Sequence, residues 1–287
     1  MDLCNIQDLK ELLGRHGFRF SKSMGQNFLI EGWVPRDIAE SSGADQAHGV
    51  LEIGPGVGTL TRELCKRAGR VTAVELDHDL YPLLAETMAD FENFTLVPGD
   101  ILRLNIPQLV EEHFGGLTPL VCANLPYNIT TPVLTALMEA HKFAAITVMI
   151  QKEVALRIAA APGSKDYGAF SLYMQYHTEP ELLFDVPPTC FIPAPKVTSA
   201  VLHCRVRETP PVSPACGEDF FFRTVRGGFA QRRKTLVNSL SSVFSELSKP
   251  DIAEAIAACG LPESVRGERL GLAEYAALAD ALYHKIN

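Results

Sequence analysis

The chain has 287 residues, with 26 Lys or Arg against 34 Asp or Glu, and its formal net charge is −8. Hydrophobic residues make up 47% and charged residues 21% of the chain, which excludes a disordered protein and predicts a globular one of about two domains. Taken as a sum, the negative charge speaks against a protein that binds nucleic acid, since such proteins usually carry a basic surplus.

Cysteine spacing and apolar runs speak against two further classes. The seven cysteines form no CxxC pair and the histidines lack zinc-ligand spacing, so we expect reduced thiols and no metal site. The longest apolar stretch, residues 144–150, is far shorter than the roughly 20 residues of a membrane span. The N-terminal residues also lack the pattern of a signal peptide. The sequence therefore predicts a cytoplasmic protein.

Short apolar runs alternate with amphipathic segments in the first half of the chain. Strands are predicted at residues 50–53, 71–75, 94–97, 119–123 and 145–150, and helices at residues 6–17, 35–42, 59–67, 79–88 and from 132. Continuously apolar strands separated by helices are typical of a parallel sheet that is covered on both faces. We therefore predict an α/β fold with a doubly wound, Rossmann-like sheet.

The second half of the chain has a different pattern. Two β-rich runs, 181–186 and 198–206, are joined without a full helix, so we expect them to form an antiparallel edge of the sheet. Residues 208–217 read as a linker, because their prolines and small residues continue neither element. Only helices are predicted beyond it, at 218–229, 234–244, 251–258 and 273–283. The expected domains are residues 1–208, a sheet domain with an N-terminal helical arm, and residues 209–287, a small C-terminal all-helical domain.

A glycine-rich loop, EIGPGVG at residues 52–58, follows the first of these strands. Alternate glycines allow a tight turn and a close approach of the backbone to a ligand. Glu75 ends the next strand, where a carboxylate can accept hydrogen bonds from ribose hydroxyls, and Asp100 follows the third strand, where it can accept from an adenine amine. Nicotinamide dehydrogenases share the carboxylate but have the glycine spacing GxGxxG. The spacing here favours S-adenosylmethionine, which has no pyrophosphate.

The tetrapeptide Asn124-Leu125-Pro126-Tyr127 follows the strand predicted at 119–123 and indicates methyl transfer to an adenine amine. The lone pair of that amine is delocalised into the ring, and acceptors on its hydrogens would localise the lone pair. The Asn124 side chain and the Leu125 carbonyl can supply these acceptors, while Pro126 keeps Leu125 extended. Tyr127 offers a face on which a base can stack. The alternative is an Asn-x-Pro turn with a core tyrosine.

Seven segments that occur in order along the chain carry a family resemblance. They are GQNFL (25–29), EIGPGVGTLT (52–61), VELD (74–77), NLPYNITTP (124–132), QKEVALR (151–157), FIPAPKVTSAV (191–201) and QRRKT (231–235). Together they resemble the bacterial small-subunit ribosomal RNA adenine dimethyltransferases, over nearly the whole chain.

The resemblance implies an S-adenosylmethionine-dependent rRNA (adenine-N6,N6) dimethyltransferase that releases S-adenosylhomocysteine. Its implied substrate is 16S ribosomal RNA within the small (30S) ribosomal subunit or its precursor, where two adjacent adenosines in a hairpin near the 3′ end receive four methyl groups. A role in late subunit biogenesis follows from the same resemblance. We expect no membrane partner and a monomer.

The resemblance also implies roles for individual residues. Cofactor contacts fall on Asn27, Leu29, Gly54, Glu75, Asp100 and Asn124, and target-base contacts on Asn124, Leu125, Tyr127 and Phe191. An aromatic ring at Phe191 would sandwich a flipped base against Tyr127, and a core phenylalanine before a strand is the alternative. One departure from the family is Ser21-Lys22-Ser23, which is less basic than the arm of its relatives.

Positive charge is concentrated in residues 220–240, which hold five basic side chains and no acidic one. We predict that they bind RNA phosphates, with the last three at a helix start; they are Arg223, Arg226, Arg232, Arg233 and Lys234. A solvated helix face is the alternative interpretation. Two other functions stay open: a non-catalytic assembly factor of the small subunit that kept the fold, and a large-subunit rRNA adenine methylase.

Overall fold

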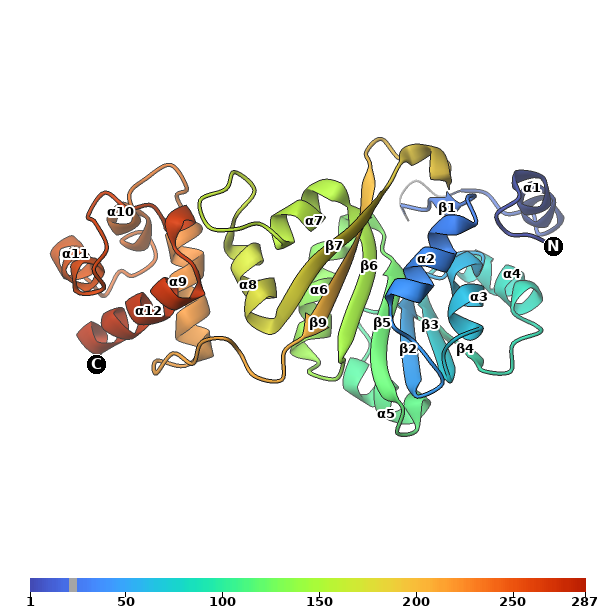
Figure 1. Cartoon of the computed structure of the whole chain (residues 1–287), viewed down its shortest axis with the longest axis horizontal. Helices are drawn as coiled ribbons and strands as arrows, with labels where there is room; N and C mark the ends of the chain where they lie inside the picture. Colours follow the sequence, from blue (N-terminus) through green and yellow to red (C-terminus); the bar gives the residue numbers. More distant parts are fainter. Residues whose placement is uncertain (21–24) are drawn as a thin grey trace. The chain divides into compact units, whose positions relative to one another are not determined.

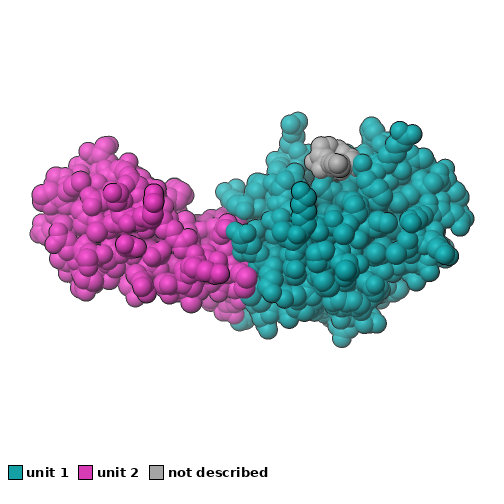
Figure 2. All heavy atoms as spheres, turned by 90° about the horizontal axis from the view of Figure 1, so that it is seen from above, with its two compact units in different colours: residues 1–155, 181–206 teal, residues 156–180, 207–287 magenta. Residues whose placement is uncertain are grey.

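The computed structural model describes residues 1–20 and 25–287 of the chain (Figure 1). The weakly basic segment Ser21-Lys22-Ser23 lies outside the described residues. The chain forms two compact units, coloured separately in Figure 2. The first contains Met1–Ala155 and Glu181–Val206, and the second contains Leu156–Pro180 and Arg207–Asn287.

Seven strands form one mixed sheet in the order β4-β3-β2-β5-β6-β9-β7. The strands are β2 (His48–Ile53), β3 (Arg70–Glu75), β4 (Phe94–Pro98), β5 (Thr118–Asn124), β6 (Ala145–Gln151), β7 (Thr178–Val186) and β9 (Ser199–Val206). Strands β2 to β6 pair in parallel, whereas β9 pairs antiparallel with β6 and is followed by β7 at the edge. The predicted doubly wound α/β fold and its antiparallel edge are confirmed.

Helices flank this sheet (Figure 1). They are α1 (Ile6–Arg15), α2 (Trp33–Ser41), α3 (Thr59–Cys65), α4 (Tyr81–Thr87), α5 (Ile106–Phe114) and α6 (Thr130–Glu139). On one face, Ile38 of α2 and Leu64 of α3 belong to the same buried apolar cluster as Val50 of β2. Each such side chain contributes roughly 1.5–3 kcal/mol by its burial. No helix in the described part of the chain is both long and apolar enough to span a membrane.

Helix α5 is absent from the sequence prediction, although its ends carry clear signals. The Asn105 side chain accepts a hydrogen bond from the backbone N–H of Gln108 at 3.1 Å and so caps the helix. Gly115 follows the last turn in a left-handed conformation, with φ of 54°. These capping residues identify a helix that its mixed polar and apolar pattern does not make obvious.

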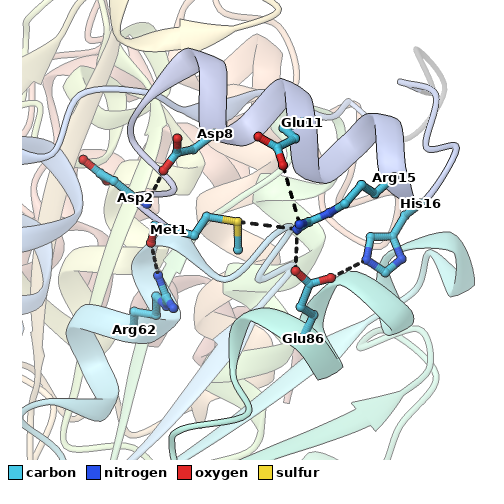
Figure 3. A network of polar contacts seen from close by, with 8 residues as sticks. All are labelled: Met1, Asp2, Asp8, Glu11, Arg15, His16, Arg62 and Glu86. Carbon is cyan, nitrogen blue, oxygen red and sulfur yellow. Dashed lines mark hydrogen bonds and ion pairs between the residues drawn. The ribbon is translucent and has the colours of Figure 1, made fainter.

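A surface network holds α1 against the rest of the first unit (Figure 3). The Arg15 guanidinium and the His16 ring contact the two carboxylate oxygens of Glu86 at 2.5 and 2.7 Å. Arg62 of α3 donates to the Met1 carbonyl at 3.0 Å. Each exposed contact stabilises the fold only slightly. Together they position the helix that precedes the pocket-lining segment 25–29 in the chain.

The second unit is helical, with α8 (Ala169–His177), α9 (Glu218–Phe229), α10 (Leu236–Leu240), α11 (Lys249–Ala258) and α12 (Leu272–Ile286). Helix α7 (Lys152–Ile158) spans the change from the first unit to the second. The expected boundary at residue 208 lies close to Val206 but misassigns residues 156–180. They belong to the helical unit because Tyr167, Leu172 and Tyr176 are buried in its apolar core.

The packing of α9 against α12 supplies a test of the helical core. A β-carbon at Gly228 would overlap the Tyr275 side chain, which is fully buried and whose hydroxyl donates to the Gly267 carbonyl. We expect Gly228→Ala to lower the free energy of unfolding in urea by about 1–3 kcal/mol, since the ring has no free space. Gly14→Ala is the control, because no atom lies within 4 Å of its β-carbon. It should stabilise α1 by about 0.5–1 kcal/mol. Equal effects of the two substitutions would contradict this packing.

Candidate active site

A pocket in the first unit lies at the carboxyl ends of the parallel strands, where open α/β sheets bind ligands. Its wall is built from segments 25–29, 52–60, 74–80, 99–101 and 124–129. All the predicted site residues of the sheet domain except Phe191 line it: Asn27, Leu29, Gly54, Glu75, Asp100, Asn124, Leu125, Pro126 and Tyr127. The structure therefore brings together residues that lie almost 100 positions apart in the chain.

The glycine loop between β2 and α3 has a backbone that only glycine adopts without strain. Gly54, Gly56 and Gly58 have φ values of 67°, 61° and 90°. A β-carbon at Gly56 would lie 3.2 Å from the Phe28 ring, so a side chain there would push against the N-terminal segment. At Gly54 and Gly56 the loop consequently presents only main chain to the pocket.

Glu75 at the end of β3 is nearly buried and held by backbone donors. Its two carboxylate oxygens accept hydrogen bonds from the Asp77 N–H at 2.9 Å and from the Gly56 N–H at 3.4 Å. Burial raises the pKa of Glu75, and these backbone donors oppose the shift. A carboxylate can accept about four hydrogen bonds, so acceptor capacity remains for the hydroxyl groups of a ligand.

Segment 25–29 forms one wall of the pocket. Strand β1 (Phe28–Leu29) pairs antiparallel with β8 (Phe191–Ile192), and the Gln26 side chain donates to Asp77 at 2.5 Å. The Asn124 amide nitrogen donates to the Asn27 carbonyl at 3.4 Å. The N-terminal segment is thus joined to the residues that follow β3 and β5. Gln26 and Asp77 have no predicted role, although they lie in the motifs GQNFL and VELD.

The Asn124-Leu125-Pro126-Tyr127 segment begins at the end of β5, and hydrogen bonds orient the groups around its two acceptors, the Asn124 amide oxygen and the Leu125 carbonyl. Because the Asn124 amide nitrogen donates to Asn27, the amide oxygen is the atom available to accept from a ligand. The Leu125 N–H donates to the Met149 carbonyl at 3.1 Å, which fixes the peptide between Asn124 and Leu125, directly before the peptide that carries the Leu125 carbonyl. Pro126 is extended, with ψ of 130°. This arrangement agrees with the prediction that the Asn124 amide oxygen and the Leu125 carbonyl accept hydrogen bonds from one adenine amine.

Tyr127 is half-buried at the pocket, and its hydroxyl is hydrogen-bonded to the Ser199 hydroxyl at 2.6 Å. Burial raises the pKa of Tyr127, and the bond to Ser199 opposes the shift. Ser199 has no exposed surface and is the first residue of β9. The hydroxyl pair restricts the orientation of the Tyr127 ring, a role that the sequence analysis did not assign to Ser199.

Phe191 is not among the residues that line the pocket. Only 3% of its surface is exposed, and it belongs to the apolar core of the first unit. The alternative of a core phenylalanine describes the observed position, and the sandwich of a base between Phe191 and Tyr127 stays a prediction. The pairing of Phe191 with Leu29 holds it in the core.

Comparison with known proteins agrees with this geometry. The family described as "Ribosomal RNA adenine dimethylase" matches residues 17–257 of the chain. The chain belongs to this family. Ribosomal RNA small subunit methyltransferase A of Alkaliphilus oremlandii is 43% identical, over 96% of this chain and 96% of its own length. The protein of the same name from Lachnoclostridium phytofermentans is 46% identical over the same shares of both chains. The resemblance and the enzyme class inferred from the motifs are confirmed.

Two solved structures are also similar. The 23S rRNA methyltransferase ErmE has a TM-score of 0.67 and 25% identity, over 89% of this chain and 99% of its own. A dimethyladenosine transferase from Plasmodium falciparum has a TM-score of 0.71 and 20% identity, over 87% of this chain and 95% of its own. The second comparison supports the fold alone.

The pocket of this adenine dimethylase also contains apolar residues that the sequence analysis missed. Leu76 and Ile101 line it, directly after Glu75 and Asp100 respectively. Leu76 has 53% of its surface exposed, which is unusual for a leucine next to a buried strand end. Both side chains offer apolar surface to a planar ring. Their position directly after Glu75 and Asp100 is the feature of the sequence from which their place in the pocket could have been predicted.

The five basic residues of the helical unit differ in what they contact. Arg223 pairs with Glu246 at 2.6 Å and lies 4.2 Å from the centroid of the Phe244 ring. Arg232 pairs with Glu268 at 3.0 Å and donates to the Lys165 carbonyl at 2.5 Å. Both arginines contact other residues of the helical unit, and their role as phosphate ligands stays a prediction.

The remaining three basic side chains, Arg226, Arg233 and Lys234, are exposed. The helix expected from residue 234 is present as α10, and it starts two residues later, at Leu236. Arg233 and Lys234 lie in a turn, and Thr235 is the N-cap of α10. The two side chains therefore extend from a turn that precedes the helix.

The hydroxyl pair between Tyr127 and Ser199 leads to a test. Ser199→Ala leaves the Tyr127 hydroxyl without its partner, and a lost hydrogen bond costs about 0.5–1.5 kcal/mol. We expect kcat for methyl transfer to fall about tenfold with little change in cofactor affinity. Tyr127→Phe keeps the ring, and the double variant should be no worse than either single one. Additive losses in the double variant would show that the two hydroxyls act separately.

Proposed function

We propose that this enzyme uses S-adenosylmethionine to transfer four methyl groups to the exocyclic amines of two adjacent adenosines near the 3′ end of 16S rRNA, in the small subunit or its precursor. The observation that carries the proposal is one pocket that contains the glycine loop, Glu75 and the Asn124–Tyr127 segment. The small-subunit substrate is supported by relatives at 43–46% identity named for it, whereas ErmE, a 23S rRNA methyltransferase, is 25% identical. The proposal includes a role in late subunit biogenesis, a cytoplasmic location and a monomeric enzyme.

The pocket residues fit S-adenosylmethionine. Glu75 would accept from the ribose hydroxyls, because its carboxylate is already oriented by backbone donors. Asp100 would accept from the adenine amine, and Leu76 and Ile101 would contact the ring. When bound, the cofactor supplies a methyl group on a positively charged sulfur.

The Asn124–Tyr127 segment would orient the target amine. The Asn124 amide oxygen and the Leu125 carbonyl would accept its hydrogens, which directs the nitrogen lone pair away from them. Tyr127 would stack on the base, which contributes roughly 1–3 kcal/mol. No strong base is required, because the amine becomes acidic once it is methylated and its proton passes to water. Catalysis then rests on orientation and electrostatics.

The alternative of a non-catalytic assembly factor is disfavoured by the same segment. A factor that only bound RNA would have no need to keep an acceptor pair and a fixed tyrosine beside a cofactor pocket. Because an RNA-binding factor would also associate with the small subunit, the two functions differ in methyl transfer, and the experiment must measure it directly.

Asn124→Ala tests the proposed chemistry. We expect labelled methyl transfer to unmethylated small subunits to fall by at least about 100-fold, the usual effect of removing one oriented polar group. Cofactor affinity, measured separately by calorimetry, should change less than about tenfold, because Glu75 and the glycine loop remain. Glu75→Ala is the matched variant, in which cofactor affinity itself should fall. Full transfer by Asn124→Ala, or label mainly on large-subunit RNA from the wild type, would contradict the proposal.

The exposed basic side chains provide a second test. Charge reversal of Arg233 and Lys234 should weaken binding to small subunits and reduce the slope of affinity against salt by about two, one for each lost phosphate contact. Cofactor affinity and thermal stability should stay unchanged. Arg232→Ala should instead lower thermal stability, because this arginine pairs with Glu268 and the Lys165 carbonyl. An unchanged salt slope in the first variant would exclude these contacts.

A further inference from the structure

Glu52 is a buried acidic residue that the proposed chemistry does not use. It lies on β2 two residues before Gly54, lines the pocket and has 1% of its surface exposed. Its Oε2 atom has no hydrogen-bond partner among the described residues. An ionised carboxylate in this position would be buried without compensation, which is strongly unfavourable. Among the described residues, no cation compensates Glu52 in its charged form.

The surroundings of Glu52 favour its neutral form. The titratable groups that face it are Glu75 on β3, Cys122 on β5 and Cys65 on α3, and none of them is a cation. Burial raises the pKa of Glu52 to about 8, the Thr61 hydroxyl opposes the increase, and the negative charge of Glu75 adds to it. These surroundings favour the carboxylic acid over the carboxylate in the free protein.

We propose that Glu52 is a proton-linked cofactor residue: it is neutral in the free protein and loses its proton to solvent when a cationic group of the cofactor binds in the pocket. The inference rests on the proposed function, because S-adenosylmethionine carries two positive charges, on its amino group and on its sulfur. The O–H bond of Glu52 breaks, the proton passes to buffer, and the resulting carboxylate is compensated by the cation. No other bond changes.

Two features of the pocket support this assignment. A positive charge nearby favours the ionised form of a carboxyl, and so it supplies the partner that Oε2 lacks. Glu75 is a weaker candidate, because both of its oxygens already accept backbone hydrogen bonds. Glu52 would thus orient the charged end of the cofactor by electrostatics, whereas Glu75 would accept from its hydroxyl groups.

The raised pKa determines the sign of two pH dependences. Cofactor affinity should increase as pH rises toward about 8, by up to about tenfold per pH unit, since binding releases a proton. The stability of the free protein should change in the opposite direction. It should fall as pH rises from 4.5, the ordinary value of the carboxyl, toward 8, because the folded state keeps a proton that the unfolded chain has lost.

Calorimetric titration of the full chain with S-adenosylmethionine between pH 5.5 and 7.5 tests the proposal. Each titration is repeated in two buffers of different ionisation enthalpy, which gives the number of protons released. We expect the wild type to release close to one proton and to bind up to about tenfold more tightly per pH unit. Glu52→Gln should release none and show no pH dependence. The amino group of the ligand stays charged over most of this range and titrates equally in both proteins.

Matched variants and ligands separate the possible causes. Glu75→Gln should bind more weakly at every pH but still release most of the proton. S-adenosylhomocysteine retains the amino group and lacks the charged sulfur, so release with both ligands assigns the amino group and release with S-adenosylmethionine alone assigns the sulfur. Thermal unfolding of the free proteins gives an independent measurement. At pH 8, the stability of the wild type should have fallen from its value at pH 6 by more than that of Glu52→Gln.

Proton release that is absent in the wild type, or unchanged in Glu52→Gln, would overturn the inference. Glu52→Asp, which keeps a carboxyl, is the second variant if Glu52→Gln does not fold, and it should retain proton release. A chain that binds S-adenosylmethionine and methylates small subunits without releasing a proton would refute only this inference. A chain that binds no cofactor would refute the proposed function itself.

Discussion

The convergence of parallel strand ends at one edge of the sheet is the constraint on which the pocket depends. Strands β2, β3 and β5 are neighbours and run in the same direction, so the residues that follow each of them meet. The glycine loop, Glu75 and the Asn124–Tyr127 segment are therefore brought together by topology, whatever their separation in the chain. The positive φ values of the loop glycines keep the space between them open to a ligand.

The short ladder between β1 and β8 adds the wall that the sheet alone does not provide. It joins Phe28 and Leu29 to Phe191 and Ile192, more than 160 residues later. The same pairing explains two observations at once: residues 25–29 line the pocket, and Phe191 is buried in the core. A motif can thus contribute to a site by supporting its wall instead of contacting the ligand.

The acidic and basic side chains of the protein are distributed unevenly between its two units. The sheet unit contains two buried carboxyl groups beside the pocket, Glu52 and Glu75, whose raised pKa values make them sensitive to a bound cation. The exposed basic side chains belong to the helical unit. The net charge of −8 therefore excluded too much, because it averages buried acids beside a pocket with exposed basic side chains elsewhere in the chain.

The sequence by itself determined the parallel sheet, the order of its elements and most of the pocket residues, since strand periodicity, glycine spacing and the Asn124–Tyr127 segment are local patterns. It could not determine which side chains are buried or already paired, because those properties depend on residues far away in the chain. Phe191 is buried through its pairing with Leu29, and Arg232 forms an ion pair with Glu268. Residues 156–180 pack into the apolar core of the helical unit. In the sequence, Glu52 is an acidic residue before a glycine loop with no distinguishing feature. Only the tertiary structure shows that it is buried and that its Oε2 atom has no hydrogen-bond partner among the described residues.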